Sequence, residues 1–227
     1  MPVYVQQSLI REEGVDVRPI GRDDAVNLVL NVHYARRVPP ISHAYGLFVD
    51  GTLMGCVTYG IPASDSVCRG LAGEEYRLRV LELNRLVVLD GAPKNSASTL
   101  VGRFLRMLPR GMYVISYADY GGWGHVGYVY QATNWLYTGK TKERTDQFTG
   151  ENRHPRHAEG ADPSSRTIRT EKHRYLFVTA HGRERGKMIR RIRWPIYDHY
   201  PKGDTRRYDV DDPRPANGMV GKALKEE

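Results

Sequence analysis

The sequence predicts an α/β fold, in which helices flank a central sheet that is part antiparallel and part parallel. Two observations carry this prediction. An Asp-Gly pair at positions 50 and 51 separates the apolar runs Tyr45–Val49 and Leu53–Tyr59, which indicates a tight β-hairpin. Further along, the strand-like run Val80–Leu89 is followed by a turn and then by Ser96–Leu108, whose apolar residues recur at helical spacing.

The remaining segments of the first half fit the same alternation. Val15–Ile20 is typical of a strand, and Ala25–Arg37 of a helix that the carboxylates of Asp23 and Asp24 can cap. The Pro-Pro pair after this helix ends it, since proline cannot donate to the helical hydrogen-bond ladder. Ile61–Tyr76 has no clear periodicity, and we expect it to be a loop.

The second half alternates in the same way before it becomes polar. The expected elements, in order, are a strand over Met112–Asp119, a helix over His125–Trp135, an extended piece at Leu136–Tyr137 and a strand over Tyr175–Thr179. Residues 138–170 hold few apolar side chains, so we expect a long loop or a partly ordered insert there. The tail from Lys202 onward is expected to be irregular.

The excess positive charge lies in the second half of the chain. The 227 residues carry 34 Lys or Arg and 26 Asp or Glu, a formal net charge of +8. Residues 1–138 hold 13 basic and 12 acidic residues, so nearly all the excess belongs to residues 139–227. Such asymmetry favours a polyanionic partner, nucleic acid first. A solvated basic face is the alternative that composition leaves open.

Composition also excludes several classes of protein. Cys56 and Cys68 are the only cysteines, which rules out a disulfide scaffold and a four-cysteine zinc site. No apolar stretch approaches the roughly 20 residues of a membrane span, and the N-terminus lacks the pattern of a secretory signal. We therefore expect an intracellular protein with no membrane partner.

The turn before Ser96–Leu108 is a candidate phosphate site. A helix N-terminus presents free backbone N–H groups and the positive end of the helix dipole. Lys94, Asn95, Ser96 and Ser98 crowd this terminus and could add donors to a pyrophosphate cradle. Ordinary capping explains the same residues without any ligand, and the local sequence leaves both readings open.

A second unit places titratable groups at the carboxyl edge of the sheet, where α/β proteins bind ligands. The strand Met112–Asp119 ends in Ser116-Tyr117-Ala118-Asp119, and His125 and Tyr130 follow a Gly-rich break. Asp119 could accept a proton or hold a metal, and Tyr130 could donate a proton to a leaving group. The alternatives are a capping carboxylate, a core tyrosine and a structural histidine.

Two further clusters could bind a ligand or a nucleic acid. His33, Tyr34, Arg36 and Arg37 lie together where the first helix gives way to a loop, although the helix dipole alone would favour the arginines there. Near the C-terminus, a basic tract is interleaved with Trp194, Tyr197 and Tyr200, and consists of Arg183, Arg185, Lys187, Arg190, Arg191 and Arg193. Cations neutralise phosphates and aromatic rings stack on bases, whereas a solvated basic face is the alternative.

The order of strand, turn, helix, strand, helix and strand from Val80 onward resembles the Gcn5-related N-acetyltransferase (GNAT) fold. In that family a tyrosine on the later helix protonates the thiolate of coenzyme A, and here Tyr130 occupies its place in YQATNW. The resemblance also implies a bulge in Val80–Leu89 that puts Asn84 and Arg85 near the acyl donor. The loop DGAPKNSAS departs from the family pattern, because it lacks the second glycine that lets backbone approach phosphate.

A closer resemblance is to the Mom family of bacteriophage DNA-modification proteins. Six motifs occur in its order between His33 and Val178: HYARRVP, GLFVDGTLMGCVTYG, LELNRL, KNSAS, SYAD and GHVGYVYQATNWLYTG. The resemblance implies conversion of adenine N6 in double-stranded DNA to N6-(carbamoylmethyl)adenine, which protects phage DNA from restriction in the cytoplasm of the infected bacterial host. The base must then leave the stack, and Tyr34, Tyr117 and Trp123 could hold it.

This function would give roles to the candidate residues. Asp119, Tyr130, His33, Tyr34 and Ser116 would be catalytic, with acetyl-CoA or another acyl or glycyl donor as co-substrate. Iron is a candidate cofactor, for which His33, Asp119 and His125 offer imidazole and carboxylate ligands. Two other functions remain open: an N-acetyltransferase of a protein or small amine that uses acetyl-CoA, and a non-catalytic DNA-binding protein on a degenerate GNAT scaffold.

The expected organisation has two parts. Residues 1–180 would form the GNAT-like transferase domain, with residues 138–170 as a polar basic insert. Residues 181–227 would form a basic C-terminal extension that contacts DNA, together with Arg36 and Arg37. The near-neutral first part would then carry the chemistry, and the basic second part would hold the nucleic acid.

Overall fold

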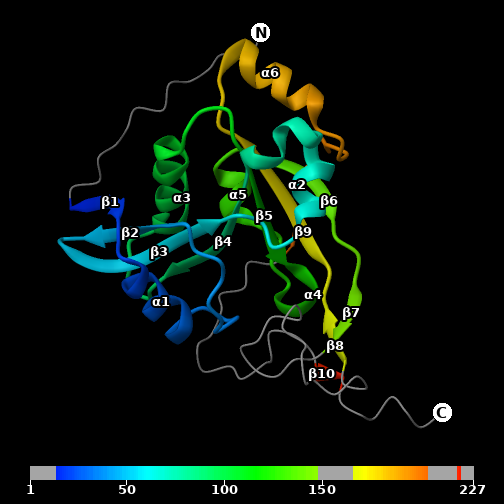
Figure 1. Cartoon of the computed structure of the whole chain (residues 1–227). Helices are drawn as coiled ribbons and strands as arrows, with labels where there is room; N and C mark the ends of the chain where they lie inside the picture. The colour runs from blue at the N-terminus through cyan, green and yellow to red at the C-terminus, as the bar shows by residue number, and fades with distance from the viewer. Residues whose placement is uncertain (1–13, 148–165, 204–218, 221–227) are drawn as a thin grey trace.

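The computed structural model describes residues 14–147, 166–203 and 219–220. Its elements alternate between strands and helices (Figure 1). In chain order they are β1 (Val15–Pro19), α1 (Arg22–Asn31), β2 (His43–Val49), β3 (Thr52–Gly60), α2 (Asp65–Ala72), the 3₁₀ helix η1 (Glu74–Arg79), β4 (Val80–Val88), α3 (Ser96–Met107), β5 (Tyr113–Asp119), α4 (Tyr120–Trp123), α5 (Tyr128–Ala132), β6 (Leu136–Lys140), β7 (Arg144–Gln147), β8 (Arg166–Arg169), β9 (Lys172–Val178), α6 (Gly182–Arg191) and β10 (Met219–Val220).

The central sheet has seven strands in the order β1-β2-β3-β4-β5-β9-β6. Only β4 and β5 run parallel, and every other neighbouring pair is antiparallel. The predicted α/β fold with a mixed sheet is therefore confirmed, and the succession β4, α3, β5, α5, β6 is the order on which the GNAT resemblance rests. The hairpin predicted at Asp50-Gly51 joins β2 to β3.

Helices cover both faces of this sheet, so the fold has three layers. On one face, α3 contributes Leu100 and Phe104 and α5 contributes Tyr130 to the largest buried cluster. On the other face, α2 and α6 bury Leu71 and Met188 in a second cluster, and α1 buries a third. Consecutive residues of β5 alternate between these faces, as β geometry requires.

A small second sheet projects from one end of the central sheet. Its order is β10-β8-β7, and both pairs are antiparallel. Strands β7 and β8 lie within residues 138–170, which excludes a loop at both ends of that segment and leaves the other expectation, a partly ordered insert. The part of it from 148 to 165 lies outside the described residues. The irregular tail expected after Lys202 likewise lies outside them, apart from residues 202–203 and β10.

Three other expectations need correction. The segment Ile61–Tyr76, expected as a loop, contains α2 and the start of η1. The helix expected over His125–Trp135 is shorter, because Gly124 and Gly127 both have positive φ angles and keep α5 from beginning before Tyr128. The first helix ends at Asn31, and the chain turns beyond it because His33 Nδ1 accepts the backbone N–H of Ala35 at 3.0 Å.

Among the described residues, no helix has both the length and the apolar character needed to cross a membrane.

Candidate active site

A pocket of about 950 Å³ opens where β4 and β5 separate. The two strands pair only from Val80 to Glu82 and from Tyr113 to Ile115. Beyond that point they diverge, and the pocket is lined by residues 83–89 of β4 and its continuation and by residues 116–119 of β5. The N-terminus of α3, the end of α1 and the segment 125–130 complete the wall. The pocket thus lies at the carboxyl ends of two parallel strands, the position expected for a ligand site.

A bulge in β4 shapes one wall of this pocket. Thr58 of β3 pairs with Arg85 and Tyr59 with Leu83, so Asn84 is an extra residue without a partner in the register. The bulge implied by the GNAT resemblance is therefore present. Asn84 itself serves the fold, because its amide accepts from Thr58 Oγ1 at 2.6 Å and donates to the Pro40 carbonyl at 2.7 Å.

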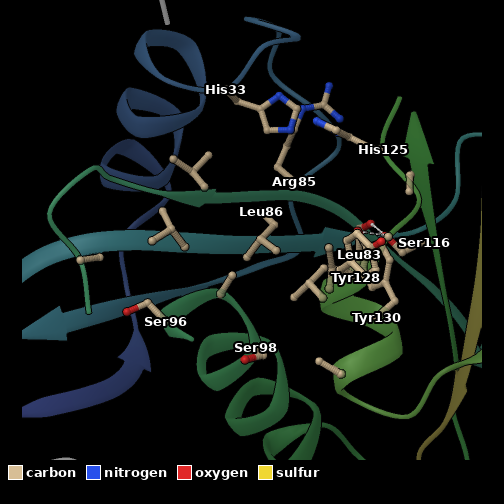
Figure 2. Close-up of a pocket in the computed structure, with 18 of the residues that line it drawn as sticks. His33, Leu83, Arg85, Leu86, Ser96, Ser98, Ser116, His125, Tyr128 and Tyr130 are labelled. Carbon is tan, nitrogen blue, oxygen red and sulfur yellow. Dashed lines mark hydrogen bonds between the residues drawn. The ribbon is translucent and has the colours of Figure 1, made fainter. Parts of the chain in front are cut away.

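Arg85, the next residue, points toward His33 and His125 (Figure 2). Its guanidinium donates to the carbonyls of Asn84 at 2.6 Å and Arg37 at 3.3 Å, while its buried Nε has no partner among the described residues. Burial lowers the pKa of Arg85, and the charge of Arg37 lowers it further. A buried guanidinium with an unused donor is suited to bind an acceptor oxygen.

The N-terminus of α3 lies on the opposite side of β4, where Figure 2 shows Ser96 and Ser98. Their hydroxyls donate to the carbonyls of Pro93 and Asn95, at 2.7 and 2.9 Å, so their protons are already used. Asn95 has a positive φ of 68° and makes no capping hydrogen bond with its side chain. Contacts to a phosphate here would therefore come from Lys94, which is exposed, and from backbone N–H groups.

Ser116 connects β4, β5 and α5 inside the pocket. Its Oγ lies 2.8 Å from the Leu83 carbonyl oxygen and 2.8 Å from Tyr130 Oη. The β4–β5 pairing ends at Glu82, so the Leu83 carbonyl has no backbone donor on β5 and can accept from the Ser116 side chain. Burial raises the pKa of Tyr130 to about 12, so its hydroxyl keeps its proton at neutral pH and can donate it.

Asp119 is buried and already engaged by three donors. Its Oδ1 accepts from Thr170 Oγ1 at 2.8 Å and from the Gly122 backbone at 3.0 Å, and its Oδ2 forms a 2.9 Å ion pair with Lys172. Thr170 and Lys172 lie just before and at the start of β9, about fifty residues further along the chain. Neither residue was predicted to belong to the site, because only the pairing of β5 with β9 brings Thr170 and Lys172 to Asp119.

The groups around Asp119 form one wall on the α1 face of the sheet. Tyr34 contacts Trp123 and His125, with ring centroids 5.5 and 5.9 Å apart, and stacks on His33 at 4.2 Å. Burial, with the charges of Arg85 and Lys172, lowers the pKa of His33 well below its usual value. Because its Nδ1 accepts a backbone N–H, neutral His33 carries its proton on Nε2 and is a donor there.

His125 is also neutral near pH 7. Burial lowers its pKa, and the nearby Asp119 carboxylate only partly offsets this effect. A neutral imidazole in a pocket can accept a proton. The pocket therefore combines a protonated phenol, Tyr130, on the α3 face with a neutral imidazole on the α1 face.

The predicted metal site does not fit this arrangement. His33, Asp119 and His125 all line the pocket, but within residues 14–147, 166–203 and 219–220 no group of three or more His, Cys, Asp or Glu could hold a metal ion. Both oxygens of Asp119 are occupied by Thr170, Gly122 and Lys172, and His33 Nδ1 accepts a backbone N–H. The structure thus gives no support to iron at these residues.

The residues predicted to bind DNA fall into two separate places. Arg37 adjoins the pocket through its carbonyl, which accepts from Arg85, and Arg36 precedes it in the same turn. The basic tract forms α6 and lies at the other end of β5, where the Tyr113 hydroxyl donates to the Met188 carbonyl at 2.8 Å. The structure does not bring Arg183, Arg185, Lys187, Arg190, Arg191 or Arg193 to the pocket.

The aromatic residues that follow α6 pack on the protein itself. Trp194 stacks under the Arg174 guanidinium, 3.8 Å from the ring centroid, and Tyr197 packs on Tyr137. The Tyr200 hydroxyl donates to the Trp135 carbonyl at 2.6 Å. These rings fasten the segment after α6 along β6 and α5, which explains their presence without a nucleic acid.

Residues 14–202 match the model of the Mom protein family. A curated relative, the methylcarbamoylase mom of Escherichia phage Mu, is 29% identical over 132 residues, which cover 56% of this chain and 54% of the relative. The match thus spans about half the length of that protein.

Two solved acetyltransferase structures align with most of this chain. The acetyltransferase of the GNAT family from Bacillus cereus ATCC 10987 is 12% identical and aligns with a TM-score of 0.43 over 74% of this chain and 99% of its own. The N-acetyltransferase from Staphylococcus aureus Mu50 is 12% identical and aligns with a TM-score of 0.44 over 73% of this chain and 98% of its own.

Proposed function

This chain belongs to the Mom protein family, and from that premise we propose that it is a transferase that modifies adenine N6 in phage DNA. The product we propose is N6-(carbamoylmethyl)adenine, in keeping with the name methylcarbamoylase that the phage Mu relative bears. The modified base would protect the DNA from restriction in the host cell.

The observation that carries this proposal is a single pocket with different chemistry on the two faces of the sheet. On the α3 face, a helix N-terminus with Lys94 lies near Tyr130 and Ser116. On the α1 face are His33, Tyr34, Arg85, Asp119 and His125. The opening between β4 and β5 joins the faces, so a donor and an acceptor bound on either side can react across it.

The acceptor would occupy the α1 face. An adenine N6 in duplex DNA is inside the base stack, so the base must swing out to reach the pocket. Tyr34 and Tyr117 line the pocket and offer rings against which it can lie, whereas Trp123 packs on Tyr34 outside the lining. The His33 Nε2 proton can donate to a ring nitrogen, and His125 can accept the proton that N6 loses.

Asp119 has an orienting role in this proposal. Its carboxylate holds Lys172, Thr170 and the Gly122 backbone, and the His125 backbone N–H donates to the Asp119 carbonyl at 2.9 Å. The residue therefore fixes the turn that carries His125. The N6 proton would be accepted by the imidazole of His125 and not by Asp119, because the Asp119 oxygens already accept from Thr170, Gly122 and Lys172.

The donor would occupy the α3 face, with its phosphate against the N-terminus of α3 and its leaving group near Tyr130. Acetyl-CoA itself would leave an amide on N6, whereas the carbamoylmethyl group is joined to nitrogen through a methylene. We therefore propose a glycyl-type donor of this shape whose methylene carries the leaving group. The N6–methylene bond forms as the bond from the methylene to the leaving group breaks, Tyr130 gives its proton to the leaving group, and His125 accepts the proton of N6.

Mass spectrometry of nucleosides from DNA co-expressed with the chain tests this function. We expect a deoxyadenosine carrying the mass of a carbamoylmethyl group, and its loss in Tyr130→Phe, which keeps the ring. Tyr76→Phe, which removes the same hydroxyl group outside the pocket lining, should retain the product and serves as the matched control. Unmodified deoxyadenosine alongside soluble wild-type protein would refute the proposal, and an acetyl mass on N6 would refute the carbamoylmethyl product.

A further inference from the structure

The ribbon formed by β7 and β8 lies at the pocket end of the sheet, whereas α6 lies at the opposite end. In the β5–β9 register, Asp119 pairs with Lys172 and Tyr113 pairs with Val178. The ribbon enters β9 at Lys172, and α6 follows the Val178 end. Six steps of about 3.3 Å separate the two ends by about 20 Å. Figure 1 shows β7 and β8 near the bottom and α6 at the top.

The base of the ribbon is bound to Asp119, a residue that lines the pocket. Arg169 ends β8, and the next residue, Thr170, donates to Asp119 at 2.8 Å. The Gly121 backbone N–H donates to the Glu171 carbonyl at 3.0 Å, which fastens the same segment to α4. The ribbon therefore has a fixed position relative to Asp119, on the α1 face where the acceptor would bind.

The ribbon and its base carry an excess of positive charge. Residues 140–147 and 166–172 hold six Lys or Arg against three Asp or Glu. Three of the cations have close carboxylates: Lys140 pairs with Glu171, Arg169 with Asp146 and Lys172 with Asp119. The other three, Lys142, Arg144 and Arg166, are exposed, and of these Arg144 lies 3.5 Å from Asp146.

The positive charge of the ribbon also acts on a group at the pocket edge. Burial lowers the pKa of Arg37, and the charge of Arg169 lowers it further. The Arg37 carbonyl in turn accepts from Arg85, which lines the pocket. Like charges repel each other, and a bound anion offsets this repulsion. A phosphate backbone supplies such anions in a row, spaced to meet several cations at once.

Resting on the proposed function, we propose that the β7–β8 ribbon, through Lys142, Arg144 and Arg166, is the surface that holds duplex DNA over the pocket. The basic helix α6 is then not the principal DNA contact. The ribbon lies beside the groups that would receive the flipped base, whereas α6 lies about 20 Å away along the strands.

Two triple variants that remove the same charge test this proposal. The ribbon variant is Lys142→Gln/Arg144→Gln/Arg166→Gln, and the matched control on α6 is Arg183→Gln/Lys187→Gln/Arg190→Gln, all of them exposed residues. Binding to a fluorescent duplex is measured by anisotropy between low and moderate salt. If each ribbon residue contacts one phosphate, the slope of log Kobs against log salt should fall by about 2.7 in the ribbon variant and remain unchanged in the control.

Circular dichroism first establishes that both variants fold like the wild type. If the ribbon triple variant does not fold, its three single variants replace it. Each single variant is expected to reduce the slope by about 0.9. An unchanged slope in the ribbon variants would overturn the proposal, as would a fall in the α6 variant alone. Nucleoside mass spectrometry separates the two proposals. Product from the wild type, together with an unchanged ribbon slope, would refute the surface and leave the function standing. A wild type that neither binds duplex DNA nor modifies it would refute both.

Discussion

Ser116 Oγ lies 2.8 Å from Tyr130 Oη and equally close to the Leu83 carbonyl oxygen. A serine hydroxyl has one proton, so Ser116 can donate to only one of these two oxygens at a time. When it donates to Leu83, the Tyr130 proton points back toward Ser116. When it donates to Tyr130, the phenol proton is free to point into the pocket. Ser116 therefore controls where the proton of the proposed acid lies.

This relationship predicts that Ser116 positions Tyr130. Ser116→Ala should slow modification by about 10- to 100-fold, less than the roughly 100- to 10,000-fold loss expected when a general acid is removed. Ser116→Thr, which keeps the hydroxyl, should restore part of the rate. Since the two residues act as one unit, Ser116→Ala should slow the Tyr130→Phe enzyme no further. The rate at which modified nucleoside accumulates measures all four variants, and additive losses would contradict the prediction.

Much of the fold follows from local sequence. The Asp-Gly hairpin, the strand β5 to within one residue and the helix α3 are set by short-range patterns that the structure confirms. The helix α2 was not predicted from the sequence. Its eight residues bury only Cys68, Leu71 and Ala72, and so short an apolar face does not distinguish a helix from a loop. It folds because η1 and α6 pack around it, a tertiary effect that no local pattern records.

Many of the pocket residues were predictable from the sequence, whereas their partners Thr170 and Lys172 were not. His33, Asn84, Arg85, Ser116 and Asp119 stand in short motifs that sequence reasoning could single out, and the pocket gathers them. Thr170 and Lys172 stand in a polar stretch with no motif, and they reach Asp119 through strand pairing across more than fifty residues. A lysine before a strand gives no sequence signal of an ion pair with a distant carboxylate.

The Asp119–Lys172 ion pair has unequal partners, which predicts unequal costs of mutation. The Asp119 side chain is 1% exposed, whereas that of Lys172 is 30% exposed. Lys172→Met leaves a buried carboxylate without its counter-charge and should cost about 3 kcal/mol of unfolding free energy. Asp119→Asn leaves an ammonium group that can turn to water, so about 1 kcal/mol is expected.

Urea denaturation at pH 7 measures both values, and the double variant tests their coupling. Asp119→Asn/Lys172→Met removes both charges and should be more stable than Lys172→Met alone. The contrary outcome would be an Asp119→Asn protein less stable than the Lys172→Met protein. Activity should fall in all three variants, because each disturbs the turn that carries His125.

Burial of His33 predicts that acid weakens the fold. Its pKa in the folded protein lies below the value of about 6.5 in the unfolded chain, so the unfolded state binds the proton first as pH falls. The stability contributed by neutral His33 is thus present above about pH 6.5 and is lost below it, by up to about 1.4 kcal/mol per pH unit.

The measurement is the difference in unfolding free energy between wild type and His33→Asn from pH 5 to pH 8. The difference cancels other titrating groups, including Glu82, whose pKa is raised by burial and which acts in the opposite direction. Wild type should lose stability more steeply than the variant below about pH 6.5. Parallel curves over this range would contradict a buried, neutral His33.

Gly127 and Gly124 form a matched pair that tests whether the placement of Tyr130 matters. Both have positive φ angles, 79° and 67°, so alanine costs about 1–2 kcal/mol of backbone strain at either site. A Cβ at Gly127 would lie 2.5 Å from Tyr175 Cε2 and 3.0 Å from Tyr130 Cδ2, while one at Gly124 meets nothing within 4 Å. Because the Gly127 carbonyl also accepts the Tyr130 backbone N–H at 2.9 Å, Gly127→Ala must move α5.

We therefore expect Gly127→Ala to reduce modification at least tenfold more than Gly124→Ala, measured by nucleoside mass spectrometry at equal amounts of folded protein. Equal losses would show that strain alone, and not the position of Tyr130, limits the reaction.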